Sequence, residues 1–98
     1  MQKGAEKMDK VNICGVPHII ERVSDGFNDN SMLGKIEYAT CKIQLNSDLT
    51  PELEKVTLAH EVIHGILTHL GYNDLSTDEV FVSSMASALC LTFDFKEW

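Results

Sequence analysis

Hydrophobic and polar positions alternate along the first half of the chain and recur every three to four residues along the second half. In the first half, residues 11–14 and 18–23 are rich in β-branched side chains. Gly15 and Pro17, which are typical turn residues, lie at the junction, so the two segments are predicted to form a β-hairpin. Residues 25–31, with the sequence Asp-Gly-Phe-Asn-Asp-Asn-Ser, have the composition of a loop.

A second hairpin is expected after this loop. Polar and apolar side chains alternate in residues 35–38 and again in residues 41–45, with Ala39 and Thr40 between the two segments. Alternation of this kind gives a strand one face for the core and one face for solvent. The first half of the chain is therefore predicted to fold as a small, mostly antiparallel sheet.

The second half carries the signals of a long helix between residues 50 and 71. Thr50 can cap its first turn, Pro51 suits the first helical position, and Gly71 offers a stop. Apolar side chains recur between these ends at helical steps, which predicts a helix of about twenty residues with a wide buried stripe. These apolar side chains are Leu53, Val56, Ala59, Val62, Ile63, Ile66, Leu67 and Leu70.

A second helix is expected from about residue 77 to about residue 92, after a short loop at residues 72–75. Because 98 residues suffice for one domain and are too few for two, the pattern describes a single α+β domain. In this domain a small sheet is followed by two packed helices. We expect the domain to cover residues 11–98 and the polar residues 1–10 to form a flexible tail.

The charge balance narrows the possible partners. Eight Lys and Arg against fifteen Asp and Glu give a formal net charge of −7, whereas a protein that grips a phosphate backbone needs concentrated positive charge. Direct binding to nucleic acid is therefore disfavoured. No run of about eighteen apolar residues is present to span a membrane, and residues 1–10 lack the apolar stretch of a signal peptide.

The cysteines indicate a cellular compartment. Cys14, Cys41 and Cys90 are widely spaced and odd in number, and no Cys-x-x-Cys motif occurs. A disulfide framework needs an even set, so we interpret the three as buried free thiols in a reducing environment. We therefore expect a cytoplasmic protein.

The sharpest motif is His60-Glu61-Val62-Ile63-His64, which lies within the predicted long helix. At about 100° per residue, two histidines four positions apart lie one turn apart on one face, so both rings can reach one ion. Neutral imidazole is a good ligand for Zn²⁺. Glu61 is rotated away from the pair and would lean over a water on the metal, as a general base does. The motif predicts a zinc site held by His60 and His64, with Glu61 as the catalytic residue.

A third protein ligand is expected, because two histidines alone hold zinc poorly. His69 lies nine positions after His60, about 180° around the same helix, and so points away from the site. Glu79 stands in the first turn of the next helix and can reach the ion if that helix folds back against the first. The carboxylates that stay open as the third ligand are Asp74, Asp78 and Glu79.

Both parts of this predicted site have a structural alternative. His60 and His64 could be helical histidines that are satisfied by ordinary hydrogen bonds. Glu79 could belong to a capping box, because Ser76-Thr77-Asp78-Glu79 places a serine three residues before a glutamate. In that arrangement Ser76 caps the second helix, and the Glu79 side chain reaches back to the backbone of Ser76.

The segment from Thr57 to His64, Thr-Leu-Ala-His-Glu-Val-Ile-His, resembles the active helix of zincin metallopeptidases. Residues 30–92 as a whole resemble the short, phage-encoded branch of the ImmA/IrrE-like metallopeptidases. The further features that carry this likeness are a hairpin containing Gly34, its end in Ile43-Gln44-Leu45-Asn46, the helix end Leu70-Gly71-Tyr72 and the helix start Asp78-Glu79.

The resemblance implies a minimal zincin-like domain in which His60, His64 and Glu79 bind Zn²⁺ and Glu61 is the catalytic acid and base. It also implies that an extended peptide substrate pairs with the strand at residues 41–45, at the edge of the sheet. On this basis we expect a zinc-dependent metalloendopeptidase, a phage protein that acts in the cytoplasm of a bacterial host on a protein such as a transcriptional repressor.

Other interpretations remain open or can be set aside. A catalytically silent zinc domain that binds a protein partner would keep the same residues as the peptidase. A bacterial ribosomal-RNA-processing metalloenzyme is similar around His64, but it needs two further histidines where this chain has Thr68 and Asp74. The zincins with a third histidine need Gly and His in place of Leu67 and Leu70, and are excluded. The candidates for the group that stabilises the oxyanion are Tyr38, Tyr72 and His18.

Overall fold

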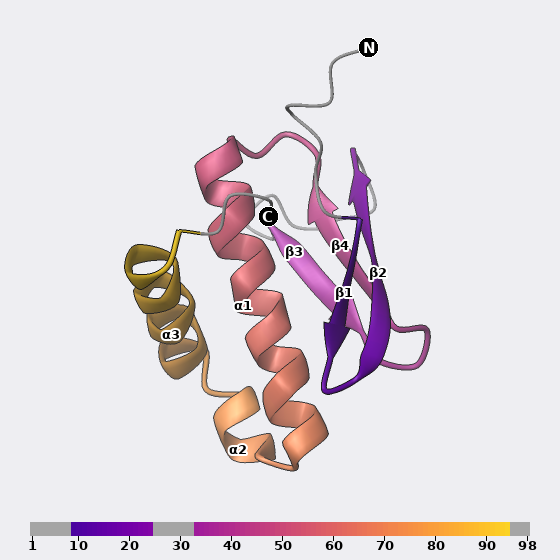
Figure 1. The fold of residues 1–98 in the computed structure, drawn as a ribbon, viewed down its shortest axis with the longest axis vertical. Helices are drawn as coiled ribbons and strands as arrows, with labels where there is room; N and C mark the ends of the chain where they lie inside the picture. Colours follow the sequence, from indigo (N-terminus) through magenta and orange to yellow (C-terminus); the bar gives the residue numbers. More distant parts are fainter. Residues whose placement is uncertain (1–8, 25–32, 95–98) are drawn as a thin grey trace.

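The computed structural model of the chain describes residues 9–24 and 33–94. The sheet lies against one side of the long helix α1, and the helices α2 and α3 lie against its other side (Figure 1). This arrangement is the α+β fold that the sequence predicted. The elements in chain order are β1 (Lys10–Ile13), β2 (Val16–Val23), β3 (Gly34–Glu37), β4 (Lys42–Asn46), α1 (Pro51–Leu70), α2 (Asn73–Ser76) and α3 (Glu79–Thr92).

The four strands form one mixed sheet in the order β1-β2-β4-β3. Both predicted hairpins are confirmed, since β1 pairs with β2 and β3 pairs with β4, each pair antiparallel. The two hairpins are joined by a parallel pairing of β2 with β4, in which Ile20 lies opposite Ile43. The edges of the sheet, within the described residues, are therefore β1 and β3.

The strand order corrects the expectation that residues 41–45 form the edge of the sheet. β4 pairs on both sides, with β2 and with β3. Ile43 and Leu45, the core-facing side chains of β4, are both 0% exposed, which fits a central strand. The alternation used for the prediction does not determine which strands pair, and the parallel pairing with β2 places β4 inside the sheet. Within the described residues, the edge strand with the more extensive packing against α1 is β3, and a strand added on that side could pair with it.

α1 is buried on two sides, as its wide apolar stripe predicted. One side packs against the sheet and the other against α3, so the helix separates two small cores. The first core contains Ile13, Ile20, Ile43, Leu45, Leu58 and Val62, and the second contains Ala59, Ile63, Val82 and Ala86.

Both ends of α1 follow the predicted signals. Thr50 Oγ1 accepts a hydrogen bond from the backbone N–H of Leu53 at 3.2 Å, which satisfies one donor of the first turn. Gly71 has a φ of 86°, the left-handed conformation that favours glycine, and ends the helix. In the first turn, Glu54 accepts two hydrogen bonds from the Arg22 guanidinium of β2, at 3.0 and 3.3 Å. This paired contact ties the start of α1 to the sheet.

The connection between α1 and α3 differs from the prediction. Residues 72–75 were expected to form a loop and Ser76 to cap the second helix, but Asn73–Ser76 form the short helix α2. Ser76 is buried, and its hydroxyl donates to the backbone carbonyl of His64 at 3.2 Å. Asp78 caps α3 instead, with Oδ1 accepting from the Phe81 N–H at 3.1 Å. The capping box is therefore wrong, because burial takes Ser76 away from the helix start and aspartate caps equally well.

The three cysteines are free, as predicted, but they are not buried. Cys14 is exposed, and Cys41 and Cys90 are partly exposed. Cys14 sits in the tight turn of the first hairpin, with a φ of 52° and Gly15 following at 85°, so its side chain faces solvent. For Cys14, the prediction of a buried thiol was wrong because it ignored this turn.

Two predicted segments lie largely or wholly outside the described residues. These are the loop at residues 25–31 and the tail at residues 1–10, of which the structure describes Asp9 and Lys10. Lys10 already belongs to β1, so the sheet begins one residue before the predicted start of the domain at residue 11. The predictions for residues 1–8 and 25–31 therefore stay predictions.

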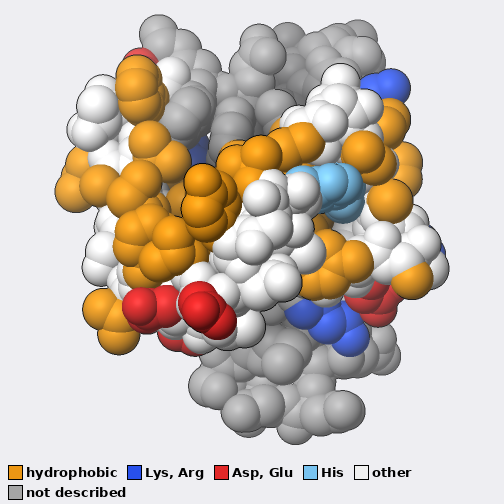
Figure 2. Space-filling model, turned by 90° about the horizontal axis from the view of Figure 1, so that it is seen from below, with side chains coloured by type: hydrophobic (Ala, Val, Ile, Leu, Met, Phe, Trp, Pro, Cys, Tyr) orange, Lys and Arg blue, Asp and Glu red, His pale blue; other side chains and the backbone are white. Residues whose placement is uncertain are grey.

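Exposed hydrophobic side chains gather at the end of the molecule where α1 meets α2, which is the face seen in Figure 2. Leu70, Tyr72 and Leu75 are among them. Within the described residues, no helix is both long enough and apolar enough to cross a membrane.

Candidate metal centre

The ring nitrogens of His60 and His64 converge on the carboxylate of Glu79. The two Nε2 atoms lie 3.1 Å apart, one helical turn from each other on α1. Glu79, the first residue of α3, places Oε1 at 3.0 Å from His60 Nε2 and Oε2 at 3.2 Å from His64 Nε2. The structure thus brings together the two histidines and the third residue that the sequence analysis favoured.

The packing of α3 against α1 explains how Glu79 reaches the histidines. α2 turns the chain back at the end of α1, and Val82 and Ala86 of α3 then pack on Ala59 and Ile63 of α1. These four side chains are buried, so the two helices meet closely along the second core. The start of α3 is thereby held beside the middle of α1, which carries the motif.

The three side chains fit a tetrahedral divalent ion. Four ligands at about 2.0–2.1 Å from Zn²⁺ lie roughly 3.3 Å from one another. The two Nε2 atoms are 3.1 Å apart, Glu79 places a different carboxylate oxygen near each of them, and one ligand atom from each of the three residues lies within 4.8 Å of the others, so small side-chain shifts would bring them around one ion. The Glu79 side chain is 65% exposed, so one side of the group is open. Two imidazoles, one carboxylate and an open position are a donor set that catalytic zinc sites use. Within residues 9–24 and 33–94, no other such group of His, Cys, Asp and Glu converges.

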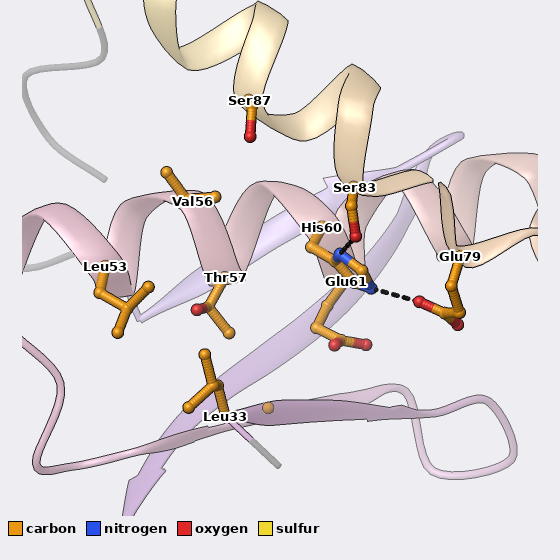
Figure 3. Close-up of a pocket in the computed structure, with 10 residues that line it drawn as sticks. Leu33, Leu53, Val56, Thr57, His60, Glu61, Glu79, Ser83 and Ser87 are labelled. Atoms are coloured by element: carbon orange, nitrogen blue, oxygen red, sulfur yellow. Dashed lines mark hydrogen bonds and ion pairs between the residues drawn. The ribbon is translucent and has the colours of Figure 1, made fainter. Parts of the chain in front are cut away.

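A serine of α3 contacts the far side of the first histidine. Ser83 Oγ lies 3.3 Å from His60 Nδ1. A dashed line marks this contact in Figure 3. A proton on Nδ1 would be donated to this hydroxyl, leaving the lone pair of Nε2 available for an ion. No local sequence pattern pointed to Ser83, because its role depends only on how α3 packs against α1.

Burial sets the charge of the residues around the group. It lowers the pKa of His60 below the ordinary value, and the neighbouring His64 adds to this effect, while Glu79 opposes both. His60 is therefore neutral at pH 7, the form that can bind a metal ion. Burial also raises the pKa of Glu61 to about 7, with a further contribution from the negative charge of Glu79. A divalent cation nearby would favour the ionised form of Glu61 again.

Glu61 lies beside the group without belonging to it. Its side chain is 7% exposed and lines the same hollow as His60 and Glu79. In Figure 3, His60 and Glu79 point toward each other, while the Glu61 carboxylate extends from α1 into the hollow next to them. Glu61 can therefore face a molecule that occupies the open side of the group, as the sequence analysis expected.

The edge strand β3 forms the other wall of this site. Gly34, Lys35 and Ile36 of β3 line a hollow together with the two histidines and both glutamates. A Cβ at Gly34 would lie 2.9 Å from Thr57 Cγ2 and 3.1 Å from the carbonyl oxygen of Gln44. Glycine is needed here so that β3 can approach α1 closely.

Of the oxyanion candidates, only Tyr38 lines this hollow. It follows β3 directly, and its Oη accepts a hydrogen bond from Thr68 Oγ1 at 3.2 Å. Tyr72 lines a separate hollow at the end of α1. His18 is 1% exposed, and its Nδ1 donates to the carbonyl oxygen of Val16 at 2.9 Å. The structure therefore leaves Tyr38 as the candidate within reach of the site.

The other predicted alternatives for the third ligand lie apart from the group. Asp78 is occupied as the cap of α3, and Asp74 is exposed on α2 beside Tyr72. His69 packs against the ring of His18, with the ring centroids 6.1 Å apart. Among the described residues, Glu79 is the carboxylate that meets both histidines.

Comparison with protein-family models, with curated proteins and with solved structures found no match for this chain. The resemblance to ImmA/IrrE-like metallopeptidases therefore stays a prediction from the quoted motifs. What the structure adds is the convergence of His60, His64 and Glu79 next to Glu61.

Proposed function

We propose that this protein is a zinc-dependent metallopeptidase of the ImmA/IrrE-like type that hydrolyses a peptide bond in a protein substrate. The observation that carries the proposal is the buried carboxylate of Glu61, which lies beside a three-ligand group with an open side. A purely structural zinc site usually has four protein ligands and needs no such carboxylate. The arrangement therefore favours catalysis over a structural role for the metal.

In this proposal His60, His64 and Glu79 hold the ion. When bound there, a zinc ion would act as a Lewis acid on the carbonyl group of the substrate and would lower the pKa of a water molecule to about 7. Glu61 accepts the proton of the attacking water and then delivers it to the nitrogen of the leaving amine. Ser83 keeps the His60 ring in the orientation that turns Nε2 toward the ion.

Tyr38 supplies the hydrogen bond to the oxyanion. Its Oη lies 3.2 Å from Thr68 Oγ1, a contact that positions the phenol at the hollow, where it could donate its proton to an oxygen of the substrate. A donor aimed at the developing charge stabilises the transition state more than the ground state. Thr68 acts as a positioning residue, since it contacts the phenol and not the substrate.

The substrate would bind as an extended peptide along β3. This strand is the free edge of the described sheet beside α1, and it lines the hollow that contains the histidines and glutamates. Backbone groups of an added strand can pair with such an edge. A protein segment in an extended conformation, such as a loop of a transcriptional repressor in the cytoplasm of a bacterial host, meets this requirement.

The test compares wild-type protein with Glu61→Gln, because the amide keeps the size of the side chain but cannot accept the proton. Both zinc-loaded proteins are incubated with a pool of peptides from a bacterial proteome, and candidate phage repressors are co-expressed with each. New termini are then identified by mass spectrometry. We expect cleavage only by the wild type and equal zinc content in both proteins.

Identical fragment patterns from the two proteins would remove the peptidase proposal. If zinc is bound by both and neither cleaves, the catalytically silent zinc domain that binds a partner takes its place. Treatment of the wild type with a chelator is the second control, since it should abolish cleavage while leaving the polypeptide unchanged.

A further inference from the structure

Helix α3 is covered on one side only. Figure 1 shows it as the outermost layer, with α1 between it and the sheet. Of its 14 residues, Val82 and Ala86 are buried, both against α1. At about 100° per residue, four exposed residues on the opposite side of the helix fall within about 80° of one another. These residues, which we call the outer face of α3, are Val80, Ser84, Ala88 and Leu91.

The outer face of α3 carries no charge, although it is exposed. Val80 is 78% exposed and Leu91 is 89% exposed. No charged residue and no histidine occurs from residue 80 to residue 93, whereas 23% of the whole chain is charged. A helix that meets solvent normally places charged and polar side chains on its outer side. The outer face of α3 is therefore suited to contact with another protein surface.

The charge of the chain indicates where two copies can meet. Each copy has a formal net charge of −7, so most of its surface repels a second copy. The acidic residues that flank residues 80–93 are Glu79 and Asp94, and Glu79 turns toward the two histidines of α1. Between these two positions, the outer face of α3 lets two copies approach without placing like charges in contact.

The sizes of the side chains along the outer face of α3 suit an antiparallel second copy. The large residues Val80 and Leu91 stand near its two ends, and the small residues stand between them. Two helices that cross touch at the crossing point and diverge toward their ends. Small side chains at the centre let the backbones come close, and larger ones fill the widening gap. An antiparallel copy places its Leu91 beside Val80, and two-fold symmetry repeats this contact.

We propose that the outer face of α3 is the contact surface of a homodimer, with the two-fold axis at the middle of the helix. A helix of this length is about 21 Å long and about 10 Å across, so one face covers roughly a few hundred Å². Stable complexes bury about 800 Å² on each partner, so this dimer is a weak one, with a dissociation constant on the order of 0.1 mM. The proposal is independent of the proposed function, because the metal centre uses none of the four residues.

Sedimentation equilibrium of the whole chain, at concentrations on both sides of this dissociation constant, tests the proposal. We expect a reversible equilibrium between monomer and dimer. The dimer should become tighter when the ionic strength rises from about 0.01 M to about 1 M. Over this range the Debye length falls from about 30 Å to about 3 Å, which screens the repulsion between two negatively charged copies.

Two substitutions and a matched control locate the contact. Ala88→Glu and Leu91→Glu place a carboxylate at the centre and at one end of the outer face of α3. Burial of one leucine contributes about 10-fold or more to association, and each substitution occurs twice in the dimer, so both should weaken it by at least about 10-fold. Leu70→Glu is the control, because Leu70 is also a leucine in the last turn of a helix and is 59% exposed. Its dissociation constant should equal that of the wild type. Circular dichroism should show the same helix content in all variants, since glutamate is a good helix former.

Three results would overturn the proposal. One is a protein that stays monomeric at every concentration and ionic strength. Another is a dimer that neither Ala88→Glu nor Leu91→Glu weakens; if Leu70→Glu dissociates it, the contact lies instead among the exposed hydrophobic side chains where α1 meets α2. The third is a dimer that weakens as ionic strength rises, because opposite charges would then hold the copies together.

Discussion

Asp78 and Glu79 are neighbours in the sequence, and replacing each with alanine should give opposite results in two measurements. Asp78 caps α3 by accepting the Phe81 N–H, whereas Glu79 faces both histidine Nε2 atoms at 3.0 and 3.2 Å. The first substitution should affect the stability of the metal-free protein, and the second should affect the binding of zinc. The pair thus tests the assignment of the third ligand with a built-in control.

The metal-free effects follow from the helix start. Loss of an aspartate cap lowers the free energy of unfolding by about 1 kcal/mol. For a domain of this size, that change lowers the melting temperature by about 4–8 °C. Glu79→Ala should change the melting temperature little, because its side chain is 65% exposed and alanine is a good helix former. Removal of its charge also relieves the repulsion that it exerts on Glu61.

The effects of the two substitutions on zinc-dependent stabilisation should be the reverse of their effects on the metal-free protein. A ligand present at about 100 times its dissociation constant stabilises the folded state by about 2.7 kcal/mol, which corresponds to a rise of roughly 10–20 °C in the melting temperature. Asp78→Ala should show the same rise as the wild type, since its ligands are intact. Glu79→Ala should lose most of the rise, because two histidines alone hold zinc poorly.

The assay is thermal unfolding followed by circular dichroism, with and without zinc, after removal of metal by a chelator. Metal analysis of each protein purified without chelators accompanies it, and we expect about one zinc per chain in the wild type. A zinc-dependent rise that persists in Glu79→Ala and disappears in Asp78→Ala would show that the third ligand was assigned to the wrong residue. No zinc in any of the proteins would refute the metal centre.

Three further substitutions test separate parts of the structure. Ser83→Ala should weaken zinc binding by about 10-fold, measured by competition with a chelator, without changing metal-free stability. Glu54→Ala should lower the free energy of unfolding by about 2–3 kcal/mol in a denaturant titration, because it removes the carboxylate that accepts two hydrogen bonds from the largely buried Arg22; zinc affinity should be retained. Tyr38→Phe should lower kcat by about 100-fold on any peptide that the wild type cleaves, with KM nearly unchanged; an equal rate would remove Tyr38 from the mechanism.

The sequence was sufficient to predict the features that depend on a single segment of the chain. Thr50, Pro51 and Gly71 mark the ends of α1, and the structure has the helix between them. The spacing of His60 and His64 follows from helical geometry, so their convergence needs no tertiary information. These features depend on contacts between residues that are at most a few positions apart.

The order of the strands could not be obtained in the same way. Alternation predicted both hairpins, but it gave no information on how one hairpin pairs with the other. β3 and β4 show similar alternation, yet β4 is central and β3 lies at the edge. The difference arises from the parallel pairing of β2 with β4, which joins residues more than twenty positions apart. The predicted substrate edge was therefore placed one strand too far inside the sheet.

Contacts between residues far apart in the sequence also explain why Glu79 had two competing interpretations, as a metal ligand and as part of a capping box. As a cap, Ser76 would place Glu79 at the third helical position, where its carboxylate turns back to the helix start. Ser76 instead lies in α2, where its hydroxyl donates to the His64 carbonyl and lies 2.9 Å from Thr68 Oγ1. These two partners belong to α1, so the cap of α3 moves to Asp78 and Glu79 becomes the first helical residue. Its side chain is then free of the capping role and faces the histidines, so α2 is the element that brings the start of α3 to the candidate metal site.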